Sequence, residues 1–309
     1  MDNNHFDVIV IGGGAAGLSA ALMLVRARRD VLVIDAGSPR NRFADHMYSV
    51  LGHDGLDPAE LLAIGRQELA GYGAQLRTGQ VIAVEATADA VRIRTADGDD
   101  LVARALIVAT GLTDRLPEIP GLARWWGRGV LHCPYCHGYE VRDQRLGVLA
   151  TGPLGLHQAQ LLRQWSQNLT FFSAGAGQLE PEMVRRLGSR GVRIVADPVV
   201  EVLGDDRLSG VRTADGAVTG LDAVFTAGTA EPHDGFLAPL ELARQTNPVG
   251  SFLAVDRAGR TSHPRIFAVG NVVDPMANVA QSMGAGSLTG GFVNMELVTE
   301  DFDRALVPA

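Results

Sequence analysis

The sequence contains little cysteine. Only two of its 309 residues are cysteine, and Cys133 and Cys136 are separated by just two residues. A pair this close cannot build the disulfide framework of a small secreted protein, and two ligands alone make a poor zinc site. A redox role is therefore the favoured interpretation of the pair.

Long apolar runs and long runs of one charge are also missing. No stretch approaches the roughly 20 apolar residues that span a bilayer, and the N-terminus lacks a basic segment followed by an apolar one. The formal net charge of -8 is spread along the chain, which predicts no surface for nucleic acid or anionic membranes. We therefore expect a cytoplasmic protein whose partners are small molecules or another protein, with no nucleic acid and no membrane among them.

The N-terminal segment has the pattern of a dinucleotide-binding module. An apolar strand over residues 6–11 leads into the glycine turn of residues 12–17 and an alanine-rich helical stretch. A second apolar strand ends in Asp35, 23 residues after Gly12. A glycine turn alone can be a structural bend, but this context predicts a pyrophosphate at the helix N-terminus and an adenosine ribose on Asp35.

The chain also contains an internal repeat. Residues 91–98 lead into the strand 106–111, and residues 211–216 lead into the strand 223–228. Each of these two segments predicts a strand, an Asp-Gly hairpin and a further strand that ends on glycine. The length of the chain and its 46% hydrophobic content allow two such modules, each with its own core.

A second glycine turn lies before the second hairpin. It follows an apolar strand over 145–150, covers residues 151–155 and opens a helical stretch that reaches Trp165. The closing strand and helix of the first module are expected only later, over 265–270 and 277–298. The second module is thus inserted in the first.

These patterns predict an α/β fold with two Rossmann-like, three-layer dinucleotide-binding domains. We place the first part of one dinucleotide-binding domain at residues 1–115 and its second part at 235–309. The domain between them, residues 116–234, carries the cysteine pair.

The cysteine turn has the features of a reactive thiol site. Pro134 stands between the cysteines, and a helix that begins there would stabilise the thiolate of Cys133 or Cys136. His137 follows directly and can accept a thiol proton near neutral pH, with His132 as a weaker candidate. The alternatives are that the cysteines are small core residues and that His137 only caps the turn.

Over essentially its full length the chain resembles the low-molecular-weight thioredoxin reductase family, the class II FAD-dependent pyridine nucleotide-disulfide oxidoreductases. The motifs are the first glycine turn, Ala109-Thr110-Gly111, the CxxC, the second nucleotide turn, and residues 267–271. The resemblance implies that Cys136 lies against the flavin and that Cys133 exchanges with the substrate. It also implies a homodimer, an FAD-binding domain formed by residues 1–115 and 235–309, and an NAD(P)H-like domain formed by residues 116–234. The implied FAD-binding residues are Gly12, Gly14, Ala15, Ala16, Gly17, Asp35, Ala109, Thr110, Gly111, Gly270 and Asn271.

Two departures from this family tune the site. His137 replaces the aspartate that usually follows the second cysteine, and Asn271 replaces the aspartate next to the flavin ribityl chain.

A third departure makes NADPH doubtful. The first glycine of the second turn is replaced by Ala150, and residues 173–177 are Ser-Ala-Gly-Ala-Gly where the reductases carry a His-Arg-Arg cluster. No basic residue follows until Arg185, so charge-assisted contacts to a 2′-phosphate are missing. Gly152, Gly155 and Ser173 are the possible remnants of an NAD(P)H site.

With a CxxC-His turn and a degraded NADPH site, the chain is similar to the dithiol oxidases of gliotoxin- and holomycin-type pathways. The leading hypothesis is a dithiol oxidase that forms a disulfide in a small molecule and passes electrons through the CxxC and FAD to oxygen. The alternative is an NAD(P)H-dependent, thioredoxin reductase-like enzyme whose partner is a thioredoxin-like protein. No metal is expected.

Overall fold

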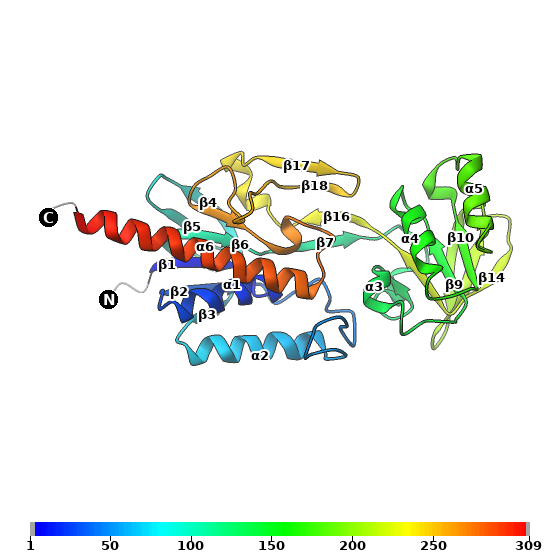
Figure 1. Ribbon diagram of the computed structural model, residues 1–309, viewed down its shortest axis with the longest axis horizontal. Coiled ribbons are helices and arrows are strands. Elements are labelled where there is room, and N and C mark those ends of the chain that lie inside the picture. Colours follow the sequence, from blue (N-terminus) through cyan, green and yellow to red (C-terminus); the bar gives the residue numbers. More distant parts are fainter. Residues whose placement is uncertain (1–3, 307–309) are drawn as a thin grey trace. The chain divides into compact units, whose positions relative to one another are not determined.

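The computed structural model describes residues 4–306 and divides into two compact units (Figure 1). The first unit is formed by the chain up to Arg42, by Pro58–Thr113 and by the chain from Ala230 onward. The second unit is formed by Phe43–Asp57 and Asp114–Thr229. The sequence-based boundaries after residues 115 and 234 stay predictions.

The first unit is built on a seven-stranded sheet with the order β3-β2-β1-β6-β5-β4. β19 pairs with the last three residues of β6, whereas β5 pairs with the first half of β6. The pairs among β3, β2, β1, β6 and β19 are parallel, and β4-β5-β6 form an antiparallel meander. The strands are β1 (His5–Ile11), β2 (Val31–Asp35), β3 (Gln75–Thr78), β4 (Val81–Ala86), β5 (Val91–Thr95), β6 (Asp100–Val108) and β19 (Ile266–Ala268).

Alternate side chains of this sheet feed two cores. Val8 and Val10 of β1 pack with helices on one face, whereas Ile9 and Ile11 pack with the meander on the other. This is the period-two alternation of a strand buried on both faces. The helices of the first unit are α1 (Ala15–Arg26), α2 (Pro58–Gly71) and α6 (Val279–Leu306), and α1 lies against α6 (Figure 1).

The second unit repeats this plan. Its five-stranded sheet has the order β11-β10-β9-β15-β8, and all of its pairs are parallel. One face packs against helices and the other against the antiparallel sheet β12-β13-β14. The strands are β8 (Val130–Leu131), β9 (Leu146–Leu149), β10 (Leu169–Phe172), β11 (Arg193–Val195), β12 (Val199–Gly204), β13 (Leu208–Thr213), β14 (Val218–Gly220) and β15 (Ala223–Thr226), and the helices are α3 (Pro134–His137), α4 (Leu154–Leu162) and α5 (Pro181–Gly188).

The remaining strands form two small ribbons. β7 (Leu112–Arg115) and β16 (Thr229–Pro232) pair with each other where the chain passes between the units. β17 (Arg244–Asn247) and β18 (Gly250–Leu253) form a hairpin. The predicted α/β fold with two parallel-sheet modules is confirmed, and so are the hairpins at residues 95–100 and 213–218.

The last helix is longer than the sequence pattern predicts, because α6 continues past residue 298 to Leu306. Within residues 4–306, no helix combines the length and the apolar character needed to cross a lipid bilayer.

Candidate functional site

The first glycine turn is closely packed against the neighbouring strand. Gly12 has a φ of 107°, and a Cβ there would lie 2.3 Å from the backbone oxygen of Ala109. At Gly17, the first glycine of α1, a Cβ would lie 1.9 Å from the oxygen of Gly12. By contrast, none of the described residues comes within 4 Å of a Cβ built on Gly14. The turn is therefore closed behind Gly12 and open in front of Gly14, where α1 begins and its N–H groups can meet an anion.

Asp35 ends β2 beside this turn. A Cβ on Gly13 would lie 2.8 Å from the Asp35 carboxyl carbon, so the carboxylate borders the turn as expected. The structure adds a neighbour that the sequence did not indicate, because Arg66 Nη2 of α2 donates to Asp35 Oδ2 at 2.9 Å. This bond orients the Asp35 carboxylate.

Ala109, Thr110 and Gly111 follow β6 at the same edge of the sheet. The hydroxyl oxygen of Thr110 is buried and has no hydrogen-bond partner among residues 4–306. A buried polar atom without a partner is a place for a ligand or for water. Together with the open space at Gly14, this hydroxyl fits a dinucleotide cofactor at the carboxyl edge of the parallel strands.

Gly270 and Asn271 come from the late part of the chain and complete the same edge. Gly270 has a φ of 78°, and a Cβ there would lie 2.9 Å from the Cβ of Ala16. Asn271 Nδ2 donates to the backbone oxygens of Asp274 and Ala277, both at 2.9 Å. The amide nitrogen of Asn271 therefore donates its hydrogen bonds within its own loop.

The cysteine pair lies in the second unit, at the start of the one-turn helix α3. Cys133 is extended and Pro134 begins the helix, so that the N–H groups of Cys136 and His137 donate back to the Cys133 oxygen. The Sγ atoms are 2.6 Å apart, with Cys136 as the donor. Since a disulfide bond is about 2.05 Å long, the pair can interconvert between thiols and disulfide with little movement.

His137 is the base candidate beside this pair. Burial lowers the pKa of its imidazole below the usual 6.5. Its Nδ1 is buried and lacks a hydrogen-bond partner within the described part of the chain. The ring is therefore neutral at neutral pH and able to accept a proton. Tyr48, from the loop before α2, contacts it edge-on.

Two further side chains hold the cysteine turn. Gln158 of α4 is buried and donates from Nε2 to the backbone oxygen of His132, at 2.8 Å. The ring of Trp165 packs so closely on the turn that a Cβ on Gly138 would lie 2.8 Å from it. Neither Gln158 nor Trp165 was indicated by the sequence. Tyr135, between the two cysteines, is 66% exposed and stands edge-on to Trp165.

The segment after β10 packs against Ala150, where the second nucleotide turn begins. A Cβ on Gly175 would lie 2.0 Å from the backbone oxygen of Ala150, and Ser173 is buried with its hydroxyl donating to the Val195 oxygen at 3.4 Å. Gly155 meets Ala150 closely, whereas Gly152 faces open space among the described residues. The position expected to bind a nucleotide ribose is thus turned into the fold.

The structure brings the predicted residues together in two groups. The first unit gathers the glycine turn, Asp35, residues 109–111 and Gly270 at one sheet edge. The second gathers Cys133, Cys136 and His137 in one turn. Such a fold, with a dinucleotide cradle and a CxxC turn, defines a dinucleotide-dependent disulfide oxidoreductase.

Comparison with known proteins gives the family. Residues 6–286 match the family model described as pyridine nucleotide-disulphide oxidoreductase, and the chain belongs to that family. It is a flavin-dependent thiol–disulfide oxidoreductase, as the sequence predicted, and FAD is the cofactor that the first cradle fits.

Curated and solved relatives agree with this assignment. The chain is similar to a thioredoxin reductase, tcpT, of Claviceps purpurea, with 32% identity covering 96% of both chains. It is 27% identical to a thioredoxin reductase of Aquifex aeolicus over 90% of both. The crystal structure of HlmI has a TM-score of 0.92 and 44% identity, covering 98% of this chain and 95% of that one.

Proposed function

We propose that the protein is a dithiol oxidase that closes a disulfide in a small molecule. The observation that carries the proposal is the lack of a nucleotide-binding side chain after β10 in the second module. Ser173 is buried, Gly175 lies against Ala150, and no basic residue occurs between Ser173 and Arg185. Without a carboxylate for the ribose or a cation for a 2′-phosphate, this module would bind a nicotinamide nucleotide weakly, which favours a thiol as the source of electrons.

The chemistry follows from the cysteine turn. A substrate thiolate attacks the Cys133 sulfur of the Cys133–Cys136 disulfide, and Cys136 leaves as a thiolate. His137 then takes the proton from the second substrate thiol, whose sulfur attacks the substrate sulfur of the mixed disulfide. The substrate disulfide closes, Cys133 leaves as a thiolate, and two electrons remain on the cysteine pair.

FAD, when bound, would supply the two-electron acceptor that restores the cysteine disulfide, and the two electrons would pass on to oxygen. The residues that would hold it are the glycine turn, Asp35 and Thr110. Arg66 binds one carboxylate oxygen of Asp35, and the other would be the acceptor for a ribose hydroxyl.

The reductase direction is the second candidate. The names of the curated relatives favour it, since tcpT and the Aquifex aeolicus protein are both called thioredoxin reductase. In this direction the partner is a thioredoxin-like protein, and electrons come from NAD(P)H. Oxidised thioredoxin with NADPH in a coupled assay separates the two candidates.

Oxygen uptake tests the oxidase proposal. The holoenzyme mixed with a small dithiol in air should consume oxygen and accumulate the cyclic disulfide, and NADPH in place of the dithiol should not. Oxygen uptake or thioredoxin reduction with NADPH, and neither with dithiol, would leave the reductase as the function.

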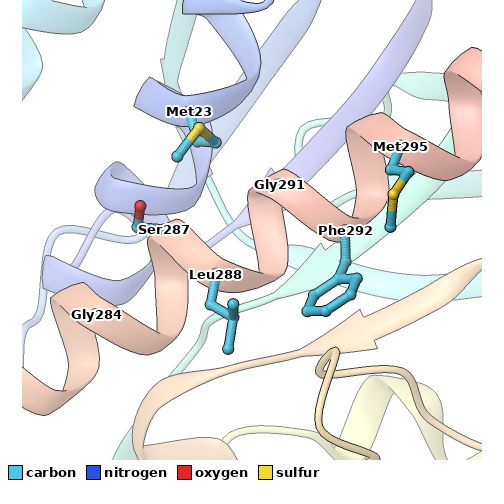
Figure 2. Close-up of a pocket in the computed structure, with 7 residues that line it drawn as sticks. All are labelled: Met23, Gly284, Ser287, Leu288, Gly291, Phe292 and Met295. Atoms are coloured by element: carbon cyan, nitrogen blue, oxygen red, sulfur yellow. The ribbon is translucent and has the colours of Figure 1, made fainter.

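We also propose that the chain forms a homodimer through an exposed face of α6. Figure 2 shows the groove, lined by residues of α6 and by Met23 of α1. The opposite face of α6 is already buried against α1 and the sheet. The residues of the exposed face follow one another at spacings of four, three, four, three and four, and are Gly284, Leu288, Gly291, Met295, Val298 and Phe302.

This spacing is a heptad seam, which is the signature of packing against another helix. Gly284 and Gly291 have open space where a Cβ would be, within the described part of the chain, so a helix can approach closely. A second copy of α6 offers the same seam, and a twofold axis makes one such face complementary to itself. We place the dimer in the cytoplasm, where reducing conditions suit a cycling cysteine pair.

A further inference from the structure

The loop that precedes α2 is held by its own hydrogen bonds. Met47 and Leu56 close its neck, with Met47 N donating to the Leu56 oxygen at 2.9 Å. Ser49 has a φ of 64°, which is uncommon for a non-glycine residue, and its N–H donates to Asp54 Oδ1 at 2.7 Å. Such strain persists only where the surroundings enforce it, and it is common at functional sites.

Tyr48 sits at this neck and reaches His137. The two ring centroids are 6.3 Å apart, and the planes meet at 86°, an edge-on contact. His46 also lies near Tyr48, with ring centroids 6.4 Å apart, and its Nδ1 lies 3.0 Å from the Gly55 oxygen. The loop, which belongs to the second unit, therefore presents Tyr48 from a fixed base.

His137 shares its one-turn helix with Cys136 and is faced by the ring of Tyr48 from the loop. Burial, Glu140 and Asp54 raise the pKa of Tyr48, so its hydroxyl stays protonated. The loop thus brings an uncharged ring against the imidazole, and burial is the cause that lowers the pKa of His137.

We infer that Tyr48 is a positioning residue, whose ring covers the imidazole of His137, keeps water from it and fixes its plane beside the cysteine pair. This inference rests on the proposed function, in which His137 accepts the thiol proton. Backbone bonds of the loop fix Tyr48, and Tyr48 in turn orients the base.

Histidine-selective NMR titration of the holoenzyme tests the contact, with His137→Gln used to assign the resonance. In the wild type and in Tyr48→Phe, which keeps the ring, His137 should titrate below its usual 6.5. In Tyr48→Ala the midpoint should rise toward that value, because water reaches the imidazole. Leu51→Ala, at a fully exposed position of the same loop, is the matched control and should leave the midpoint where it was.

An unchanged midpoint in Tyr48→Ala, or an equal change in Leu51→Ala, overturns the inference. If Tyr48→Ala loses its flavin, Tyr48→Gln replaces it in the same titration. The acid limb of kcat with a small dithiol is the second readout, and it should move with the NMR midpoint while KM changes little. A midpoint that moves without the acid limb would reject His137 as the base and leave the contact with Tyr48 standing.

Discussion

At the scale of single residues, the two sulfur atoms decide whether the turn can react at all. We expect both Cys133→Ser and Cys136→Ser to lower turnover about 10³-fold or more, since serine cannot form the disulfide that exchanges with substrate. Flavin content should be unchanged, because the cofactor cradle lies in the other unit. Turnover of the purified variants within tenfold of the wild type would mean that the chemistry bypasses the pair.

We expect the side chain of Gln158 to contribute to the stability of the fold. Gln158→Leu removes the part-buried hydrogen bond to the His132 oxygen, which costs up to about 1–3 kcal/mol. Part of this is offset, because Gln158 Oε1 is itself buried without a partner among residues 4–306. We therefore expect a loss of about 1 kcal/mol in denaturant unfolding. Gln164→Leu, at an exposed position just after α4, is the control, and an equal loss there would refute the argument.

The residues that could be found from the sequence are those whose partners are close along the chain. Cys133, Cys136 and His137 share one turn, so their spacing alone predicts their chemistry. Tyr48 and Arg66 act on residues far away in sequence, and only the folded backbone brings them to His137 and Asp35. A single sequence carries no local signal for such pairs.

At the scale of elements, α6 carries the most specific expectation. Met295 lies in the exposed seam and is 56% exposed, so Met295→Arg should convert a dimer into a monomer in analytical ultracentrifugation without unfolding it. Val218→Arg is the control, since Val218 on β14 is equally exposed and lies outside the seam. A wild-type chain that sediments as a monomer, or a Met295→Arg dimer, would disprove the seam.

The end of α6 is tied to the sheet by ion pairs. Arg265 binds Glu300 through two nitrogen–oxygen contacts of 2.9 and 3.0 Å, and Arg104 adds a third at 3.1 Å. These arginines, Arg265 foremost, lower the pKa of Glu300 to about 2. They also anchor α6 beyond residue 298, near which the hydrophobic pattern predicts its end.

The ion pairs give a pH dependence with a definite sign. A carboxyl whose pKa is lower in the folded state stabilises the fold above its unfolded pKa, near 4.5, and this stability is lost as pH falls toward 2. Glu300→Gln should therefore lower the free energy of unfolding at pH 7 by about 1–2 kcal/mol after solvent screening. The difference from the wild type should shrink in thermal melts below pH 4.5; a constant difference would contradict this role.

At the scale of the whole molecule, much of the fold was predictable from the sequence because the chain contains two copies of one module. Glycine turns, buried strands and Asp-Gly hairpins recur at similar spacing, so local patterns fix both modules. No such pattern predicts that Phe43–Asp57 belongs to the second unit. This grouping depends on contacts between residues distant in sequence, such as the close packing of the Phe43 backbone oxygen against Gly127.

The two modules differ in the side chains that could bind a nucleotide, and we propose that this difference sets the direction of electron flow. Gly14 and Gly152 both face open space among the described residues. After β2, however, Asp35 offers a carboxylate, whereas after β10 Ser173 is buried and no basic residue follows until Arg185. Electrons should therefore enter from thiols at the cysteine pair rather than from NADPH.

Anaerobic stopped-flow mixing of the oxidised holoenzyme tests this claim most directly. The absorbance of the oxidised flavin, at about 450 nm, is followed after mixing. The enzyme is mixed with a small dithiol and, in a separate experiment, with NADPH. The account predicts rapid bleaching by the dithiol and little or none by NADPH. Rapid bleaching by NADPH with none by the dithiol would contradict it.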